Sequence, residues 1–146
     1  MADTLGTYGG AGKDGLGRIA AFEAWLSRHV RAMDFFAFGT WEELLNEATW
    51  ALNYGWSRQN PMRPMIFSIP MLTKENKYDF DDAATGEFDD HFKALGNLLV
   101  RYGFGASTLR IGWEFNLGMW PWSPAQAPGG WRVNAPKYAD AFRRIA

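Results

Sequence analysis

Apolar residues recur with two different spacings at the start of the chain. Between residues 14 and 29 they lie three or four positions apart with charged residues between them, which predicts an amphipathic helix. Residues 4–10 and 33–38 are instead short runs of small, β-prone or apolar residues, and such runs are typical of strands. The chain is therefore predicted to begin with a strand, a helix and a second strand.

The same alternation continues in the middle of the chain. Thr40 and Glu43 have the spacing of a capping box, in which a hydroxyl and a carboxylate each satisfy a backbone donor. This pair predicts a helix over residues 41–54. The apolar run at residues 65–71 is interrupted by Pro70 near its end, which predicts a third strand that stops there.

The C-terminal half repeats the alternation twice more. Residues 73–86 are charged and rich in turn-forming residues, so we expect a solvated loop, followed by a helix over residues 88–102. An apolar run that begins at Thr108 predicts a buried fourth strand that delivers polar groups at its end. Asn134 has the character of an N-cap, with a proline soon after it, and predicts the start of a last helix.

Four strand–helix units in succession predict an α/β fold with a parallel sheet. Parallel barrels of eight such units need roughly 250 residues, whereas this chain has 146. We therefore expect a (βα)4 half of a TIM-type (β/α)8 barrel, a single partial domain over residues 1–146 that ends in the fourth helix. In such barrels the chemistry lies at the carboxyl ends of the strands.

Composition excludes several classes of function. The formal net charge is -1, which gives no basic footprint for nucleic acid. No apolar run approaches the roughly 20 residues that span a bilayer, so no membrane partner is expected, and the N-terminus has no charged segment followed by an apolar core, so no signal peptide is expected in this chain. There is no cysteine, and His29 and His91 lie in different predicted helices, so no metal or cofactor is expected.

Aromatic residues make up 16% of the chain, with eight tryptophans. Sugar rings stack their apolar C–H faces on indole, so this excess favours a carbohydrate surface. Several of these aromatics fall in one stretch around a single carboxylate, together with a cation, an amide and a glycine. Its members are Arg110, Trp113, Glu114, Asn116, Gly118, Trp120 and Trp122.

This stretch resembles the strand-four signature of the family 26 glycoside hydrolases, the β-mannanases and their glucanase and xylanase relatives. The resemblance implies an N-terminal part of a retaining, endo-acting β-glycanase for mannan- or glucan-type polysaccharides, secreted as the full-length protein. It implies Glu114 as the general acid/base, with the nucleophile on a seventh strand, so the isolated 146-residue chain is expected to bind glycan weakly and to turn over little or nothing. Trp113 stands where many mannanases have histidine, so mannan specificity does not follow.

The residues themselves agree with a glycosidase site. A general acid needs a raised pKa, and the aromatic neighbours Trp113, Phe115 and Trp120 would favour the neutral form of Glu114. The alternative is a structural pair between Glu114 and Arg110. Strand alternation predicts Arg110, Glu114 and Asn116 on one face of the fourth strand, with Arg110 beneath the acid and Asn116 at the mouth.

The remaining substrate-binding candidates are aromatic. Trp120 and Trp122 are expected to form a stacking wall, and Tyr8 and Trp41 to line a cleft. Asp34 would lie deep within the barrel, so we expect a structural role for it. Two other interpretations of the chain stay open. It could be a non-catalytic module that binds a β-linked oligo- or polysaccharide, or a half-barrel that self-associates through unpaired strand edges.

Overall fold

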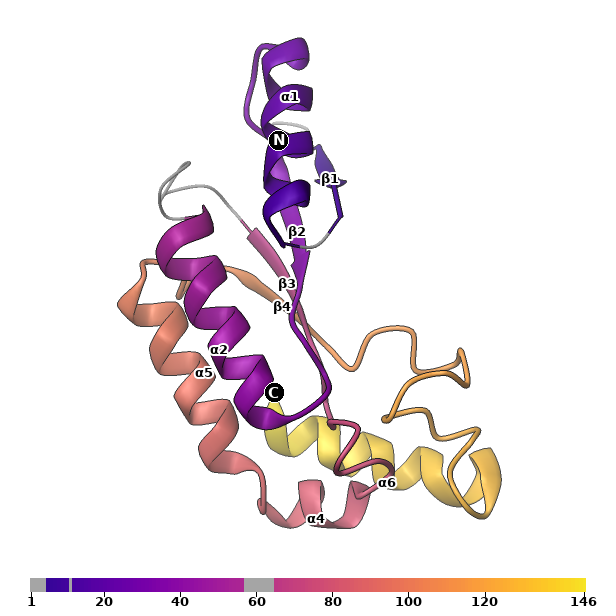
Figure 1. Cartoon of the computed structure of the whole chain (residues 1–146). Coiled ribbons are helices and arrows are strands. Elements are labelled where there is room, and N and C mark those ends of the chain that lie inside the picture. Colours follow the sequence, from indigo (N-terminus) through magenta and orange to yellow (C-terminus); the bar gives the residue numbers. More distant parts are fainter. Residues whose placement is uncertain (1–4, 11, 57–64) are drawn as a thin grey trace.

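The computed structural model describes residues 5–10, 12–56 and 65–146. These residues form an α/β fold with one four-stranded, all-parallel sheet in the order β1-β2-β3-β4 (Figure 1). The strands are Gly6–Tyr8 (β1), Arg31–Phe35 (β2), Met65–Ile69 (β3) and Thr108–Ile111 (β4). The predicted α/β class and parallel sheet are confirmed, and consecutive strands are neighbours in the sheet.

Helices connect the strands and extend beyond the last one. They are α1 (Gly12–Leu26), α2 (Trp41–Trp50), the π-helix η1 (Ala51–Trp56), α4 (Phe80–Thr85), α5 (Asp89–Arg101) and α6 (Gly130–Ile145). The capping box predicted for α2 is present: Thr40 Oγ1 accepts from the Glu43 N–H at 3.0 Å, and the Glu43 carboxylate accepts from the Thr40 N–H at 3.2 Å. Local sequence therefore determines where this helix begins.

The loop predicted over residues 73–86 is wrong in its second half, where α4 forms. Phe80 and Ala83 of α4 are buried, and the Phe80 ring lies 6.2 Å from that of Tyr138 in α6. Lys137 of α6 also pairs with Asp81 of α4. Burial against a helix that is distant in sequence therefore outweighs the charged, turn-like composition of this segment.

The last helix begins earlier than predicted. Its N-cap is Gly129, in the left-handed region at φ 91°, and not Asn134. Asn134 is buried inside the helix, where its amide donates to the carbonyl oxygens of Pro128 and Gly130, both at 2.9 Å. Asn134 thus donates to carbonyl oxygens from within the helix, whereas an N-cap side chain would accept from the free N–H groups of the first turn.

The two faces of the sheet differ in burial. Ala32 and Phe67 lie on the face packed against the hydrophobic core, which includes Leu44 of α2 and Leu95 of α5. Figure 1 shows α2 and α5 side by side along the sheet, with α4 and α6 at the end of the molecule opposite α1. On the other face Tyr8 is exposed, and residues such as Phe35 are only partly buried. Parallel sheets normally have both faces covered, so this partly exposed face is unusual.

Candidate active site

Glu114 lies in a turn after β4 and not in the strand. The strand ends at Ile111, and both Gly112 and Glu114 have left-handed backbones, at φ 57° and 52°. The predicted alternation of Arg110, Glu114 and Asn116 on one strand face is therefore wrong. The turn still brings Glu114 Oε1 to 3.8 Å from Arg110 Nη2, with 40% of the Glu114 side chain exposed. A pair this long and this exposed leaves the carboxylate available to a ligand.

A cavity at Glu114, here called the aromatic cavity, has a volume of about 460 Å³. It lies where the carboxyl ends of β1, β2 and β4 meet, the edge at which parallel α/β folds bind ligands. Its described lining is Tyr8, Phe35, Phe36, Ala37, Phe38, Glu47, Trp113, Glu114 and Trp120. Aromatic rings and two carboxylates therefore converge on a space of ligand size.

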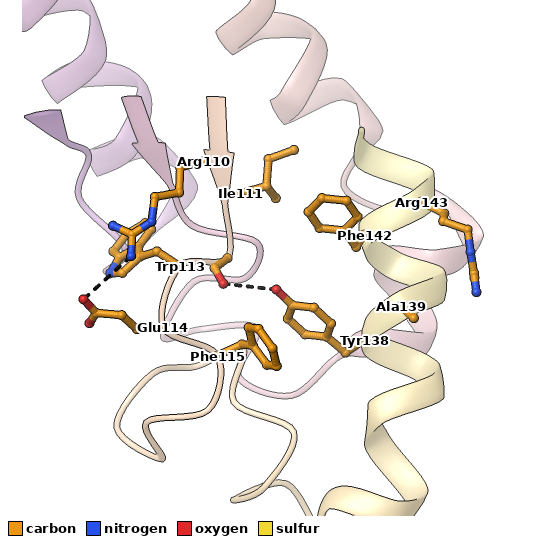
Figure 2. Close-up of a pocket in the computed structure, with 10 residues that line it drawn as sticks. Arg110, Ile111, Trp113, Glu114, Phe115, Tyr138, Ala139, Phe142 and Arg143 are labelled. Carbon is orange, nitrogen blue, oxygen red and sulfur yellow. Dashed lines mark hydrogen bonds and ion pairs between the residues drawn. The ribbon is translucent and has the colours of Figure 1, made fainter. Parts of the chain in front are cut away.

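A second cavity, here called the α6 cavity, lies between β4 and α6 and measures about 480 Å³ (Figure 2). Figure 2 shows Tyr138 reaching from α6 to the turn, where its hydroxyl donates to the Gly112 carbonyl oxygen at 3.0 Å. Burial raises the pKa of Tyr138 to about 12, so the phenol stays a hydrogen-bond donor over the ordinary pH range. Trp113 and Glu114 line both cavities and thus form the boundary between them.

Three tryptophans surround the turn, and their burial differs. Trp122 is completely buried, and its indole N–H donates to the Trp113 carbonyl oxygen at 2.8 Å. Trp113 is only 4% exposed, with its ring 4.5 Å from that of Trp122. Trp120 stacks parallel to Trp122 at 5.5 Å and lines the aromatic cavity. The predicted stacking wall is therefore wrong for Trp122, and Trp120 is the better placed ring.

Three further residues were predicted to bind substrate, and they differ in whether they line a cavity at Glu114. Tyr8, which is half exposed, lines the aromatic cavity and packs edge-on against Phe35 at 4.8 Å. Trp41 is buried between α2 and α5 and stacks on His91, so its prediction as a cleft residue is wrong. Asn116 is exposed and lines neither of the two cavities described here.

Comparison with protein-family models, curated proteins and solved structures finds no match to this chain. The site must therefore be interpreted from its own chemistry. The described residues contain no group of three or more His, Cys, Asp or Glu side chains that could hold a metal ion. In the same part of the chain, no helix has the length and apolar character needed to cross a membrane.

Glu47 is the charged residue of the aromatic cavity that the sequence did not identify. It projects from α2, and its Oε2 accepts a hydrogen bond from the Ala37 N–H in the segment after β2. Burial raises the pKa of the Glu47 carboxyl, and the hydrogen bond from Ala37 opposes that shift. The nearby charges of Asp34, which is buried, and Glu43 raise the pKa further. A glutamate in the middle of an amphipathic helix carries no sequence signal of a cavity.

We expect Glu47→Gln to stabilise the protein at neutral pH. A carboxyl whose pKa is raised by folding stabilises the fold below its unfolded pKa, and this contribution is lost as the pH rises through the folded pKa. Glutamine cannot ionise, and its amide oxygen can still accept from Ala37. Urea unfolding between pH 3 and 8 should therefore give a higher midpoint for the variant at pH 8, with the difference disappearing at the acid end. Equal midpoints at pH 8 would contradict the buried-acid assignment.

Proposed function

We propose that this chain is the N-terminal part of a retaining, endo-acting β-glycanase, with Glu114 as its general acid/base. The observation that carries the proposal is the aromatic cavity, in which Glu114 and Trp120 meet at the carboxyl ends of parallel strands. Cleavage of a β-linked glycan needs aromatic rings that stack on the sugar and a carboxyl group that can act as the acid/base. This cavity supplies both, and the nucleophile would come from the other half of the barrel. Mannan- and glucan-type polysaccharides are the proposed substrates, and the full-length protein would act outside the cell.

In this proposal the four strand–helix units form half of a (β/α)8 barrel. The sequential order β1-β2-β3-β4, the parallel direction of all strands and the partly exposed face at Phe35 support it. A retaining mechanism needs a second carboxylate about 5–5.5 Å from the acid/base. In the family that the motif resembles, this nucleophile belongs to the seventh strand.

A second candidate is a half-barrel without catalysis that binds glycan or associates with another copy. The feature that favours it is the same partly exposed sheet face, since β1 and β4 are the outer strands of the described sheet. Unpaired strand edges favour association. Sizing of the purified chain tests this candidate, because a monomer over a wide concentration range would count against association.

Binding to polysaccharide is the first test of the proposed function. In affinity gels that contain β-mannan, mixed-linkage β-glucan or xylan, we expect at least one polymer to retard the chain. Trp120→Ala should weaken retardation about tenfold, since it removes a stacking face from the cavity. Trp25, which is 77% exposed on α1, is the matched control and should tolerate alanine. Failure of every polymer to retard the chain would refute the proposal.

A further inference from the structure

The aromatic cavity contains a carboxylate that the motif around Glu114 does not include. Glu47 reaches this cavity from α2, whereas Glu114 reaches it from the turn after β4. The two carboxylates thus come from separate elements and line the same cavity of about 460 Å³. At neutral pH a partly buried carboxyl lowers stability unless its charge is compensated, so a role in ligand binding would account for Glu47.

The charges around this cavity are asymmetric. Among its described lining residues, Glu47 and Glu114 are acidic and none is Lys, Arg or His. Two described cations lie beside lining residues without lining the cavity themselves: Arg110 is 3.8 Å from Glu114, and Lys74 lies 5.1 Å above the Phe38 ring. An anionic ligand would therefore meet two carboxylates, and no lining cation would compensate its charge.

Glu47 also has hydrogen-bonding capacity beyond its bond to the backbone. Its Oε2 accepts from the Ala37 N–H, which fixes the carboxylate beside the wall formed by Phe36 and Phe38. An ionised carboxylate has about four acceptor sites on two oxygens, so one backbone donor does not saturate it. Hydroxyl groups of a sugar ring are the donors that match such an acceptor in an aromatic-walled cavity.

We propose that Glu47 is a second ligand-binding carboxylate, which accepts hydrogen bonds from hydroxyls of an uncharged sugar and, together with Glu114, excludes uronic acids from the aromatic cavity. The proposal rests on the proposed function, because it specifies which glycans the same cavity binds. Glu47 is assigned binding and selectivity here, whereas proton transfer remains with Glu114.

The proposal gives the cavity a defined pH response. The charges of Asp34 on β2 and Glu43 on its own helix act on Glu47, and Glu114 and Tyr8 are the other titratable groups that line the same cavity. Because burial raises the pKa of Glu47, it loses its charge at a higher pH than an ordinary glutamate. The charged form is the stronger acceptor, so affinity for an uncharged sugar falls as the pH falls through this pKa.

The test compares two ligands that differ only at C6, where a hydroxymethyl group is replaced by a charged carboxylate. Tryptophan fluorescence of the whole chain is titrated with a β-1,4-linked mannose tetramer and with the matching mannuronate tetramer, and the glucose and glucuronate pair is run in parallel. We expect a neutral tetramer to bind and its uronate to bind at least tenfold more weakly. Glu47→Gln should weaken neutral binding roughly tenfold at pH 7 and flatten its pH dependence. Glu42→Gln, an exposed change on the same helix, is the control and should alter neither.

Three results would overturn the proposal: no neutral tetramer binds the wild-type chain, the uronate binds as tightly as its neutral partner, or Glu47→Gln leaves affinity and pH profile unchanged. Far-UV circular dichroism of the variant establishes that it is folded before binding is compared. The outcome is separable from that for the glycanase when both are measured in a protein that also supplies the seventh-strand nucleophile. There, Glu47-dependent binding with hydrolysis that Glu114→Gln leaves unchanged supports this proposal and removes the catalytic one. Glu114-dependent hydrolysis with binding that ignores Glu47 does the reverse.

Discussion

Replacing Trp122 by alanine is expected to lower the free energy of unfolding by about 3–5 kcal/mol. The side chain is completely buried, and its indole is in ring contact with Trp113, Trp120 and Phe38. The change would leave a large cavity and remove the hydrogen bond from the indole N–H to the Trp113 carbonyl oxygen. Such a loss is a large fraction of the roughly 5–15 kcal/mol that holds a typical domain together.

Urea unfolding followed by far-UV circular dichroism measures this effect without depending on tryptophan fluorescence. Trp25→Ala is the matched control, since that ring is 77% exposed. Its free energy of unfolding should differ from that of the wild type by no more than about 0.5 kcal/mol. A loss below 1 kcal/mol for Trp122→Ala would show that the indole is not enclosed. In that case Trp122 would be accessible enough to stack on a sugar, as the sequence predicted.

In a protein that also supplies the seventh-strand nucleophile, Glu114→Gln is expected to reduce hydrolysis of a sensitive polysaccharide by roughly 10²–10⁴-fold. Glutamine keeps the size of the side chain and can still bond to a ligand, but it cannot donate a proton to a leaving oxygen. Reducing ends released from β-mannan, mixed-linkage β-glucan and xylan give the rate. Glu75→Gln, an exposed loop change, is the control and should leave the rate unaltered.

The leaving group distinguishes an acid from a merely structural glutamate. A dinitrophenyl glycoside departs without protonation, so Glu114→Gln should slow its cleavage far less than it slows polysaccharide cleavage. An equal loss on both substrates would contradict proton donation by Glu114. Loss of folding in the variant, seen by circular dichroism, would instead support the structural pair between Glu114 and Arg110, which lie 3.8 Å apart.

Features that depend on residues close together in the sequence were predictable from the sequence. The start of α2 followed from Thr40 and Glu43, because a capping box is formed by residues three positions apart. The four parallel strands followed from short apolar runs between helical segments. Helix α4 was missed because Phe80 is buried by contact with Tyr138, and a contact across so many residues leaves no local pattern.

The surroundings of Glu114 were predicted only in part. The apolar run from Thr108 had the composition of a longer strand, but Gly112 adopts φ 57° and turns the chain before the acid. Burial of Trp122 depends on how the turn folds back on Phe38, which residue type alone does not specify. Glu47 reaches the cavity because α2 lies against the segment after β2, where Ala37 donates to it, so only the folded chain reveals this residue.

The left-handed backbone of Glu114 has an evolutionary consequence. A non-glycine residue at φ 52° costs about 1 kcal/mol or more, and glycine or asparagine would occupy the same turn at lower cost. Random drift under selection for stability alone would therefore replace this glutamate readily. If related chains keep this glutamate, selection has acted on the carboxylate itself. If related chains have glycine here, the turn is conserved but the carboxylate is no longer needed for function.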